Sequence, residues 1–238
     1  MDMSEIKGLL FDKDGTLFDF AATWEAWATA FLNRLCDGDH ARALRAGARI
    51  GFDHDAGVFA PDSIVIAGTP GEVTEALLPS FPEFSGQQLI TVLNEEAARA
   101  PQREAVPLIP LLNVLRGRGL ALGVATNDAI VPARAHLSAA GIEGLFDFIA
   151  GFDSGHGAKP TPGQMQAFAT STGLPPERIA MIGDSAHDLV AGRAAGMVCV
   201  AVLTGMATAD ALAPLADVVL PDIGHLPAWL DAQIPPTD

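Results

Sequence analysis

The chain has 238 residues, of which 49% are hydrophobic, and it contains 24 Gly and 17 Pro. Its 29 acidic residues outnumber its 14 basic residues, so the formal net charge is −15 at pH 7. The composition is typical of a globular protein rather than a disordered one, and the charge argues against binding to nucleic acid or to an anionic membrane. A small anionic substrate is compatible with this charge only where a local cation or metal reverses the field.

The N-terminal sequence MDMSEIKG lacks the basic and apolar regions of a signal peptide. The apolar runs of the chain are all shorter than the ~18 residues that a membrane span needs. Because Cys36 and Cys199 lie far apart in the sequence, we expect two reduced, buried thiols rather than a disulfide framework. These features predict a soluble, cytoplasmic protein.

The chain opens with an apolar segment, residues 6–11, that stops at two carboxylates, Asp12 and Asp14. Gly15 and Thr16 follow at once and indicate a turn. A buried strand with this ending delivers side chains to the carboxyl edge of a sheet, where open α/β folds bind their ligands. We therefore expect the first strand to lead directly into a functional site.

Residues 18–105 are predicted to be mostly helical, because apolar residues recur there every three or four positions. Helices are expected over residues 18–36, 41–50, 72–78 and 86–100. Trp24 and Trp27 share a face of the first of these helices. They are most simply part of a core, although a tryptophan that faced the site would shape a substrate pocket.

An irregular segment, residues 51–71, separates these helices. It contains Asp53, His54 and Asp55, which together resemble a set of metal ligands. Since neither a Cys nor a further His lies nearby in the sequence, a solvated loop is the favoured interpretation.

From Pro107 onward, strands and helices alternate, which indicates βαβ units in a mostly parallel sheet with helices on both faces. Residues 6–11 cannot form a sheet alone, so we expect them to pair within this sheet. The predicted fold is α/β, with a Rossmann-like core formed by residues 1–17 and 106–238 and an inserted helical cap formed by residues 18–105. Core strands are expected over residues 120–125, 146–151, 178–182, 198–203 and 218–220, and core helices over residues 108–116, 129–140, 162–172, 186–195 and 209–215.

Polar side chains follow several of these strands. Thr126 and Asn127 follow one strand, Asp184 follows another with Asp188 four residues later, and Lys159 lies in a Gly-rich loop. At one sheet edge these carboxylates and those of the first strand would repel one another unless a cation lay among them. A set rich in carboxylates and poor in His and Cys favours Mg²⁺ over Zn²⁺.

The spacing of Asp12 and Asp14 suits phosphoryl chemistry, because residues two apart in an extended strand point the same way. One carboxylate, kept ionised by the metal and by Lys159, can attack phosphorus. The other can protonate the leaving oxygen and later take a proton from water. Thr126, Asn127 and the backbone N–H groups around residues 13–15 can donate hydrogen bonds to phosphoryl oxygens.

The motifs DKDGT, TN, KP followed by TPGQMQAFA, and GDSAHD occur in that order. In order and spacing they resemble the haloacid dehalogenase superfamily of phosphatases, over residues 6–20 and 107–205. The segment KPTPGQMQAFATSTGLPPERIAMIGDSAHDLVAGRAAGM is similar to the phosphoglycolate phosphatase-like branch, which has a helical cap. The resemblance implies a Mg²⁺-dependent phosphatase that acts on a small phosphorylated metabolite.

The resemblance also implies roles for the matched residues. Asp12 would form an aspartyl-phosphate, and Asp14 would be the acid and base while its backbone carbonyl binds Mg²⁺. Dehalogenating members lack the second aspartate, so Asp14 favours phosphoryl transfer. The residues expected to bind phosphate or substrate are Gly15, Thr16, Thr126, Asn127 and Lys159, and those expected at the metal are Asp12, Asp14, Asp184 and Asp188, with Lys159 balancing charge and Asp188 in support.

Some departures and alternatives remain open. The family commonly has an apolar or small residue where this chain has Lys13, which we expect to point away from Asp12 and Asp14. His187 lies within a motif, but a histidine on a helix surface is the favoured interpretation.

A phosphomutase of the same superfamily would use the same motifs, and a non-catalytic phosphate-binding relative is a further alternative. The sequence gives no indication of oligomeric state.

Overall fold

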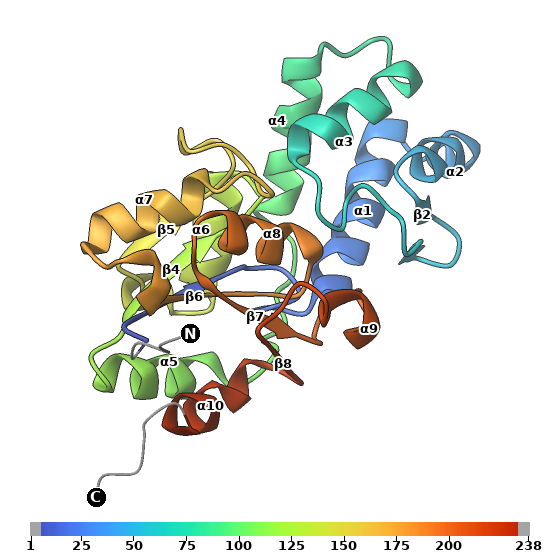
Figure 1. Ribbon diagram of the computed structural model, residues 1–238. Coiled ribbons are helices and arrows are strands. Elements are labelled where there is room, and N and C mark those ends of the chain that lie inside the picture. Colours follow the sequence, from blue (N-terminus) through green and yellow to red (C-terminus); the bar gives the residue numbers. More distant parts are fainter. Residues whose placement is uncertain (1–5, 233–238) are drawn as a thin grey trace, which may run out of the picture.

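The computed structural model describes residues 6–232, and a parallel sheet of six strands forms its core (Figure 1). The order of the strands is β5-β4-β1-β6-β7-β8, so the first strand in the sequence lies in the middle of the sheet. This confirms the predicted α/β class and the pairing of the first strand. The strands are β1 (Gly8–Phe11), β4 (Ala121–Ala125), β5 (Phe148–Ala150), β6 (Ile179–Gly183), β7 (Val198–Val202) and β8 (Val218–Leu220).

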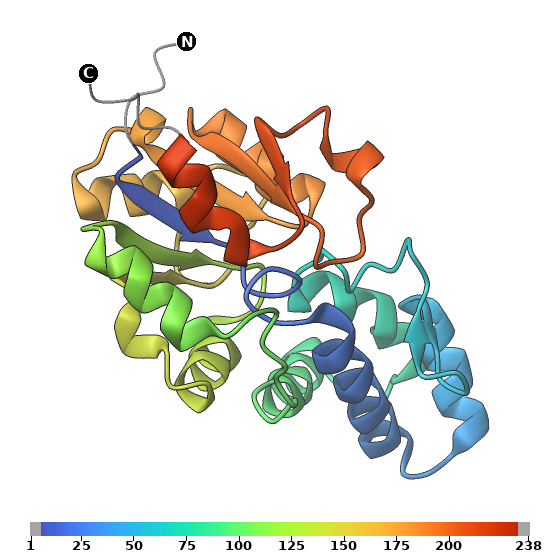
Figure 2. The same cartoon turned by 90° about the horizontal axis from the view of Figure 1, so that it is seen from below.

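Strand β1 is buried along its whole length and pairs with β4 on one side and with β6 on the other. A strand that is buried on both faces needs helices above and below the sheet. Leu9 and Phe11 pack in a cluster with residues of α5, α6 and α10, whereas Leu10 packs with residues of α7 and α8. Figure 2 shows α5 and α10 side by side along one face of the sheet.

The core helices lie close to their predicted positions, since each begins and ends near the turn residues that follow the strands. Helix α10 had no counterpart in the sequence prediction. The helices of the core are α5 (Leu108–Gly117), α6 (Ile130–Ala139), α7 (Gly163–Thr172), α8 (Ala186–Ala194), α9 (Ala209–Leu212) and α10 (Leu226–Ala232).

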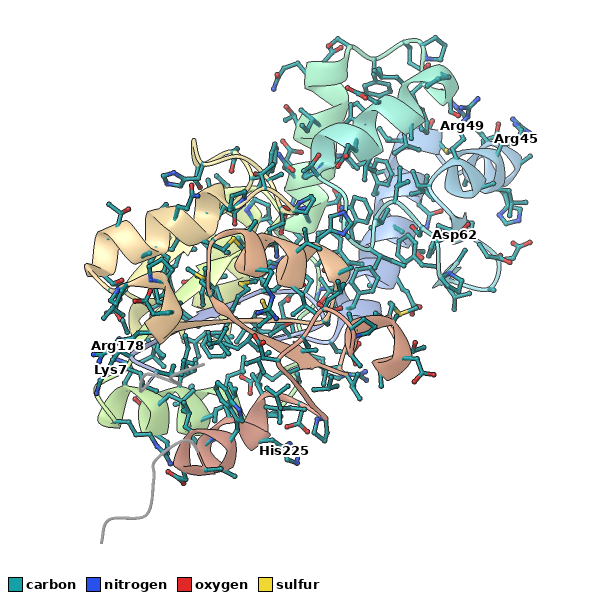
Figure 3. All side chains as sticks on the ribbon, viewed as in Figure 1. Lys7, Arg45, Arg49, Asp62, Arg178 and His225 are labelled. Atoms are coloured by element: carbon teal, nitrogen blue, oxygen red, sulfur yellow. The ribbon has the colours of Figure 1, made fainter. Side chains whose placement is uncertain are left out.

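The helical insert between β1 and α5 has its own hydrophobic core, in which aromatic side chains of α1 pack on leucines of α3 and α4. Figure 1 shows the insert at one end of the sheet. Figure 3 places Lys7 and Arg178 at the opposite end, where their backbones are hydrogen-bonded. The carboxyl ends of the strands therefore face the insert, whose elements are α1 (Phe20–Cys36), α2 (His40–Arg49), β2 (Phe52–Asp53), β3 (Val58–Phe59), α3 (Pro70–Leu77) and α4 (Gly86–Ala97).

The small hairpin of β2 and β3 replaces the irregular loop that was expected over residues 51–71. Its turn is closed by Asp53, whose Oδ1 accepts hydrogen bonds from the N–H groups of Asp55 and Ala56. Gly57 completes the turn with φ 70°, a conformation that favours glycine. The strands have only two residues each, which is too short for an alternating pattern to be recognised in the sequence.

Two chain segments connect the insert to the core, and they lie side by side. Phe18 forms β-bridges to Asp14 and to Glu104, and the N–H of Asp19 donates to the carbonyl of Arg103. Asp19 also caps α1, because its Oδ1 accepts from the N–H of Ala22 at 2.8 Å, and its other oxygen pairs with Arg103. One aspartate thus both starts the first cap helix and joins the two connections. The exact boundaries of core and cap, at residues 17 and 106, stay predictions.

Cys36 and Cys199 are both free and buried, as expected. Within residues 6–232, every helix is too short or too polar to cross a membrane.

The N-cap at Asp19 is expected to contribute measurably to stability. Replacing it in Asp19→Ala removes the acceptor for the first turn of α1 and should lower the free energy of unfolding by about 1 kcal/mol. Asp19→Asn retains a good N-cap and should stay within a few tenths of a kcal/mol of wild type, because the ion pair with Arg103 is near the surface. Urea unfolding of the three proteins measures both values, and equal losses in the two variants would contradict the capping role.

Candidate active site

A cleft lies where the carboxyl ends of β1, β4 and β6 face the cap. Because β1 is between the other two strands, Asp12 lies between Thr126 and Asp184. The cap side of the cleft is apolar apart from Asn94 and includes Phe20, Trp24, Trp27, Val65, Ile66, Val73 and Leu93. The core side is polar and consists of Asp12, Asp14, Thr126, Asn127, Asp128, Lys159, Asp184, Ser185 and His187. The cavity is about 60 Å³, which suits a small ligand.

Lys159 is buried at the centre of the polar side. Its Nζ donates to Asp12 Oδ1 at 2.5 Å, to Asp188 Oδ1 at 2.6 Å and to the carbonyl of Ala125 at 3.0 Å. All three donors of the ammonium are therefore used. Two of its partners are carboxylates, so one cation joins the residue after β1, the end of β4 and the first turn of α8.

Burial raises the pKa of Asp12 to about 7, and the nearby carboxylates of Asp188 and Asp14 add to this rise, while Lys159 opposes it. Burial likewise raises the pKa of Asp184 well above its usual range, with Asp12 and Asp188 contributing. Burial works to lower the pKa of Lys159, but Asp12 and Asp188 outweigh it and raise that pKa. The site holds more carboxylate charge than its lysines balance.

Asp12, Asp184 and Asp188 present carboxylate oxygens that lie within 4.8 Å of one another, and all three residues are buried. The oxygens of Asp188 are already engaged, since Oδ1 accepts from Lys159 and Oδ2 accepts from the backbone and hydroxyl of Ser185 at 3.0 and 2.7 Å. Both Asp184 and Asp12 line the cleft.

Asn127 is also committed to structural contacts. Its amide nitrogen donates to the carbonyls of Ala67 and Lys159, and its Oδ1 accepts from the N–H of Lys159. The side chain therefore fixes the loop that carries Lys159 and connects it to the cap at Ala67. This occupies the amide that was expected to donate to a phosphoryl oxygen, so phosphate binding by Asn127 stays a prediction for its backbone alone. Thr126 lies in the cleft, and its Oγ1 accepts from the N–H of Asp128.

Gly15 and Thr16 are outside the set of residues that line the cleft. The N–H of Gly15 donates to the carbonyl of Phe18 at 2.7 Å, so it is used within the turn. Gly15 has φ 79°, and a Cβ at this position would collide with the carboxylate of Asp184. Thr16 is fully buried. Gly15 is thus needed for the close approach of the first turn to Asp184, and phosphate binding by Gly15 and Thr16 stays a prediction.

The expectation that Lys13 points away from both acids is wrong for Asp14. The Nζ of Lys13 donates to Asp14 Oδ1 at 2.7 Å, lies 3.4 Å from Asp128 Oδ2 and lies 2.9 Å from His136 Nδ1. The residue is fully buried. A lysine can extend from a strand end past its neighbour, so the alternation of side chains along the backbone does not fix where its ammonium lies.

Several residues of the site were not identified from the sequence. Burial raises the pKa of Asp128 to about 6, with Lys13 opposing and Asp14 adding to the rise. Its position next to the TN motif was the one available signal. His136, on α6, gave no signal, because only the fold brings it to Lys13. His187 lines the cleft, in contrast to the surface position that was favoured, and Trp24 and Trp27 form part of its cap wall.

Comparisons with known proteins identify relatives of this chain and a solved structure with the same fold. At the level of sequence, the chain is 28% identical to the probable phosphatase IndB of Dickeya dadantii over 90% of this chain and 88% of that protein. It is 32% identical to a phosphoglycolate phosphatase of Rhodospirillum rubrum over 55% of this chain and 54% of that protein. Among solved structures, a predicted phosphoglycolate phosphatase from Haemophilus somnus shares the fold with a TM-score of 0.70 and 19% identity, covering 95% of this chain and 99% of that chain.

A model of the haloacid dehalogenase-like hydrolase family matches residues 6–196, which include every strand-end residue of the cleft described above. This is well over half of the chain, so the protein belongs to the haloacid dehalogenase-like hydrolase family.

Proposed function

We propose that this protein is a Mg²⁺-dependent phosphatase that hydrolyses a small phosphorylated metabolite through an aspartyl-phosphate on Asp12. The observation that carries the proposal is the pairing of Asp12 with a buried lysine at the floor of a small cleft. Lys159 is bonded to Oδ1 of Asp12, which leaves Oδ2 as the oxygen that attacks. Asp14 lines the same cleft and supplies the acid and base.

The reaction then has two steps. In the first, Asp12 Oδ2 forms a bond to phosphorus while the bond from phosphorus to the leaving oxygen breaks, and the leaving oxygen takes its proton from Asp14. In the second, Asp14 takes a proton from water as the water oxygen attacks phosphorus. The acyl-phosphate bond breaks, which releases inorganic phosphate and restores both aspartates. Lys159 and the hydroxyl of Thr126 are placed to stabilise negative charge on the phosphoryl oxygens.

The donor set fits Mg²⁺. Asp12 and Asp184 are buried carboxylates with raised pKa values, so a divalent cation between them would relieve their repulsion. We assign these two residues, with the backbone carbonyl of Asp14, to holding the ion. Because both oxygens of Asp188 are engaged, we assign Asp188 to fixing Lys159 instead. When bound, Mg²⁺ would neutralise excess negative charge and polarise the phosphoryl group.

The cleft supports a small substrate with an apolar portion. The phosphoryl group would lie on the polar core side, and the remaining part of the substrate would contact Trp24, Trp27 and their apolar neighbours on the cap. The relatives named as phosphatases support the reaction class. A substrate screen compares phosphoglycolate, suggested by the phosphoglycolate phosphatases among them, with phosphate esters that carry an apolar group, because the described cap residues that line the cleft include no cation for a second carboxylate. The acidic charge and the two free cysteines support a cytoplasmic location.

The nucleophile is tested by Asp12→Asn, which keeps the shape of the side chain and removes its attacking oxygen. We expect hydrolysis of p-nitrophenyl phosphate to fall by roughly 10³-fold or more, because a covalent step cannot be replaced by its neighbours. Circular dichroism checks that the variant is folded.

Wild-type turnover should also disappear in excess EDTA. Turnover retained by Asp12→Asn would exclude Asp12 as the nucleophile, and turnover retained in EDTA would exclude the metal.

Asp184, which we assign to the metal ion, is expected to lower the stability of the metal-free protein. Because folding raises the pKa of Asp184, the folded state loses stability as pH rises above the unfolded value. Asp184→Asn removes that loss, so in EDTA at pH 8 its melting temperature should exceed that of wild type by about 3 °C or more. The difference should shrink towards pH 4.

Added Mg²⁺ should raise the melting temperature of wild type but not that of Asp184→Asn. Asp210→Asn, which changes an exposed carboxylate on α9, serves as the matched control and should follow wild type throughout. A metal-free Asp184→Asn that is less stable than wild type at pH 8 would contradict the proposed crowding of charge.

A further inference from the structure

Lys13 is one of three lysines in the chain; it lies between the two predicted catalytic acids in the sequence, and its side chain is fully buried. Its ammonium is held from several directions. It donates to Asp14, it lies 3.4 Å from Asp128, and it lies 5.5 Å from the ring centre of Trp24, which belongs to the cap. A buried ammonium is retained only where such partners compensate for lost hydration.

His136 connects this ammonium to the cap. Its Nε2 lies 2.6 Å from the carbonyl oxygen of Ala97, the last residue of α4, so Nε2 carries the proton and Nδ1 is the acceptor for Lys13. Burial, together with the charge of Lys13, lowers the pKa of His136 to about 4, which agrees with a neutral ring. A continuous chain of contacts therefore runs from Ala97 through His136 and Lys13 to Asp14.

The contact with Lys13 decides which oxygen of Asp14 can carry a proton. An ammonium that donates to Oδ1 makes this oxygen the less basic of the two, so Oδ2 is the oxygen that carries the proton. Proton transfer to a leaving oxygen requires its donor at hydrogen-bond distance. Fixing the carboxylate at Oδ1 thus determines the direction in which Asp14 presents its proton.

We propose that Lys13 is a positioning residue that orients Asp14 for proton transfer to the leaving group, and that His136 anchors Lys13 to the cap. This inference rests on the proposed phosphatase function and deepens it. It also explains why the position between the two acids holds a lysine, since an apolar residue there would leave Asp14 and Asp128 without their nearest cation.

The test compares Lys13→Met with wild type on two aryl phosphates that differ only in a nitro group, p-nitrophenyl phosphate and phenyl phosphate. Phenolate is the poorer leaving group, so its departure depends more on the acid. The ratio kcat/KM reports on transfer to Asp12 and departure of the leaving group. We expect Lys13→Met to lower kcat/KM for phenyl phosphate by about 10²-fold and for p-nitrophenyl phosphate by less than about fivefold.

His136→Leu serves as a second variant, because it keeps the charges of Lys13, Asp14 and Asp128 and so preserves the fold if Lys13→Met does not. His136→Leu should lower kcat/KM for phenyl phosphate by about fivefold and leave kcat/KM for p-nitrophenyl phosphate unchanged. Equal losses on both substrates in the folded variants would overturn the positioning role. Failure of wild type to hydrolyse either compound would instead refute the proposed phosphatase function.

A second cluster lies at the outer end of the cap, away from the cleft, and it is carried by different observations. His40 begins α2, and His54 and Asp55 lie in the turn of the β2–β3 hairpin. Each of the three offers a ligand atom within 4.8 Å of the others. No further histidine lies near His54 in sequence, but the fold brings His40 to it, with ring centres 5.6 Å apart.

The hydrogen bonds of His54 leave one ring nitrogen available. Its Nε2 lies 3.2 Å from Asn33 Oδ1, which can only accept, so Nε2 carries the proton and Nδ1 has a lone pair. The Nδ1 atom of His54 is buried and has no hydrogen-bond partner in the part of the chain that the structure describes. Histidines that bind metals commonly donate their other N–H to a polar group in this way. Asp55 Oδ1 lies 3.0 Å from His40 Nε2, where a metal ion would replace the shared proton.

We propose that His40, His54 and Asp55 bind a transition-metal ion of the Zn²⁺ class on the surface of the cap. Imidazole nitrogens with one carboxylate suit Zn²⁺, in contrast to the all-oxygen set of the cleft. Three protein ligands leave a position for water, and the net charge of −15 favours a cation. This proposal is independent of the phosphatase chemistry.

The full-length protein is titrated with Zn²⁺ by calorimetry in excess Mg²⁺, which occupies the cleft, and with Co²⁺ by visible absorption. One equivalent should bind with a Kd in the micromolar range, and the Co²⁺ spectrum should be that of an ion with nitrogen ligands. His40→Ala and His54→Ala should each weaken binding at least tenfold.

The matched control is His225→Ala, because His225 pairs with Asp222 at the same kind of distance, 2.9 Å, but is not part of a three-residue group (Figure 3). It should bind as wild type does. Binding that survives in His40→Ala and His54→Ala, or that is lost in His225→Ala, would overturn the site.

Discussion

The contact on which the site depends is the buried ion pair of Lys159 with Asp12 and Asp188. Two carboxylates and one ammonium are largely removed from water together, so further hydrogen bonds must compensate for the lost hydration. Here the third donor of Lys159 reaches the carbonyl of Ala125, and the second oxygen of Asp188 caps α8 through Ser185. Asp12, the proposed nucleophile, is therefore held by a lysine that also contacts β4 and α8, and its position is established by the fold before a substrate arrives.

The arrangement of charges also explains why the site is suited to a metal ion and to a phosphoryl group. Asp12 and Asp184 both have raised pKa values because they are buried near other carboxylates. Under the proposed function, a cation would relieve that repulsion, and Lys159 would stabilise the charge of a bound phosphoryl group. Without a metal ion, we expect this crowding of buried charge to lower the stability of the folded protein.

The cap forms part of the cleft wall and also makes hydrogen bonds to residues of the core. Its tryptophans form the apolar wall of the cleft, and two of its backbone carbonyls, at Ala67 and Ala97, accept hydrogen bonds from Asn127 and His136 of the core. Since Asn127 fixes the Lys159 loop and His136 contacts Lys13, each of the two buried lysines is connected to the cap by one side chain. Movement of the cap would therefore disturb the hydrogen bonds that position Lys13 and Lys159.

The sequence by itself determined the α/β class, the pairing of the first strand within the sheet, and the strand ends and Gly-rich loop that carry the residues of the cleft. It did so because turn residues, apolar periodicity and motif order are local properties of the chain. Only the tertiary structure decided where the long side chains end. Lys13 reaches Asp14 and His136, which is 123 positions away, and His40 meets His54 across two elements of the cap. Such contacts depend on how helices pack against strands, and no local pattern in the sequence encodes that distance.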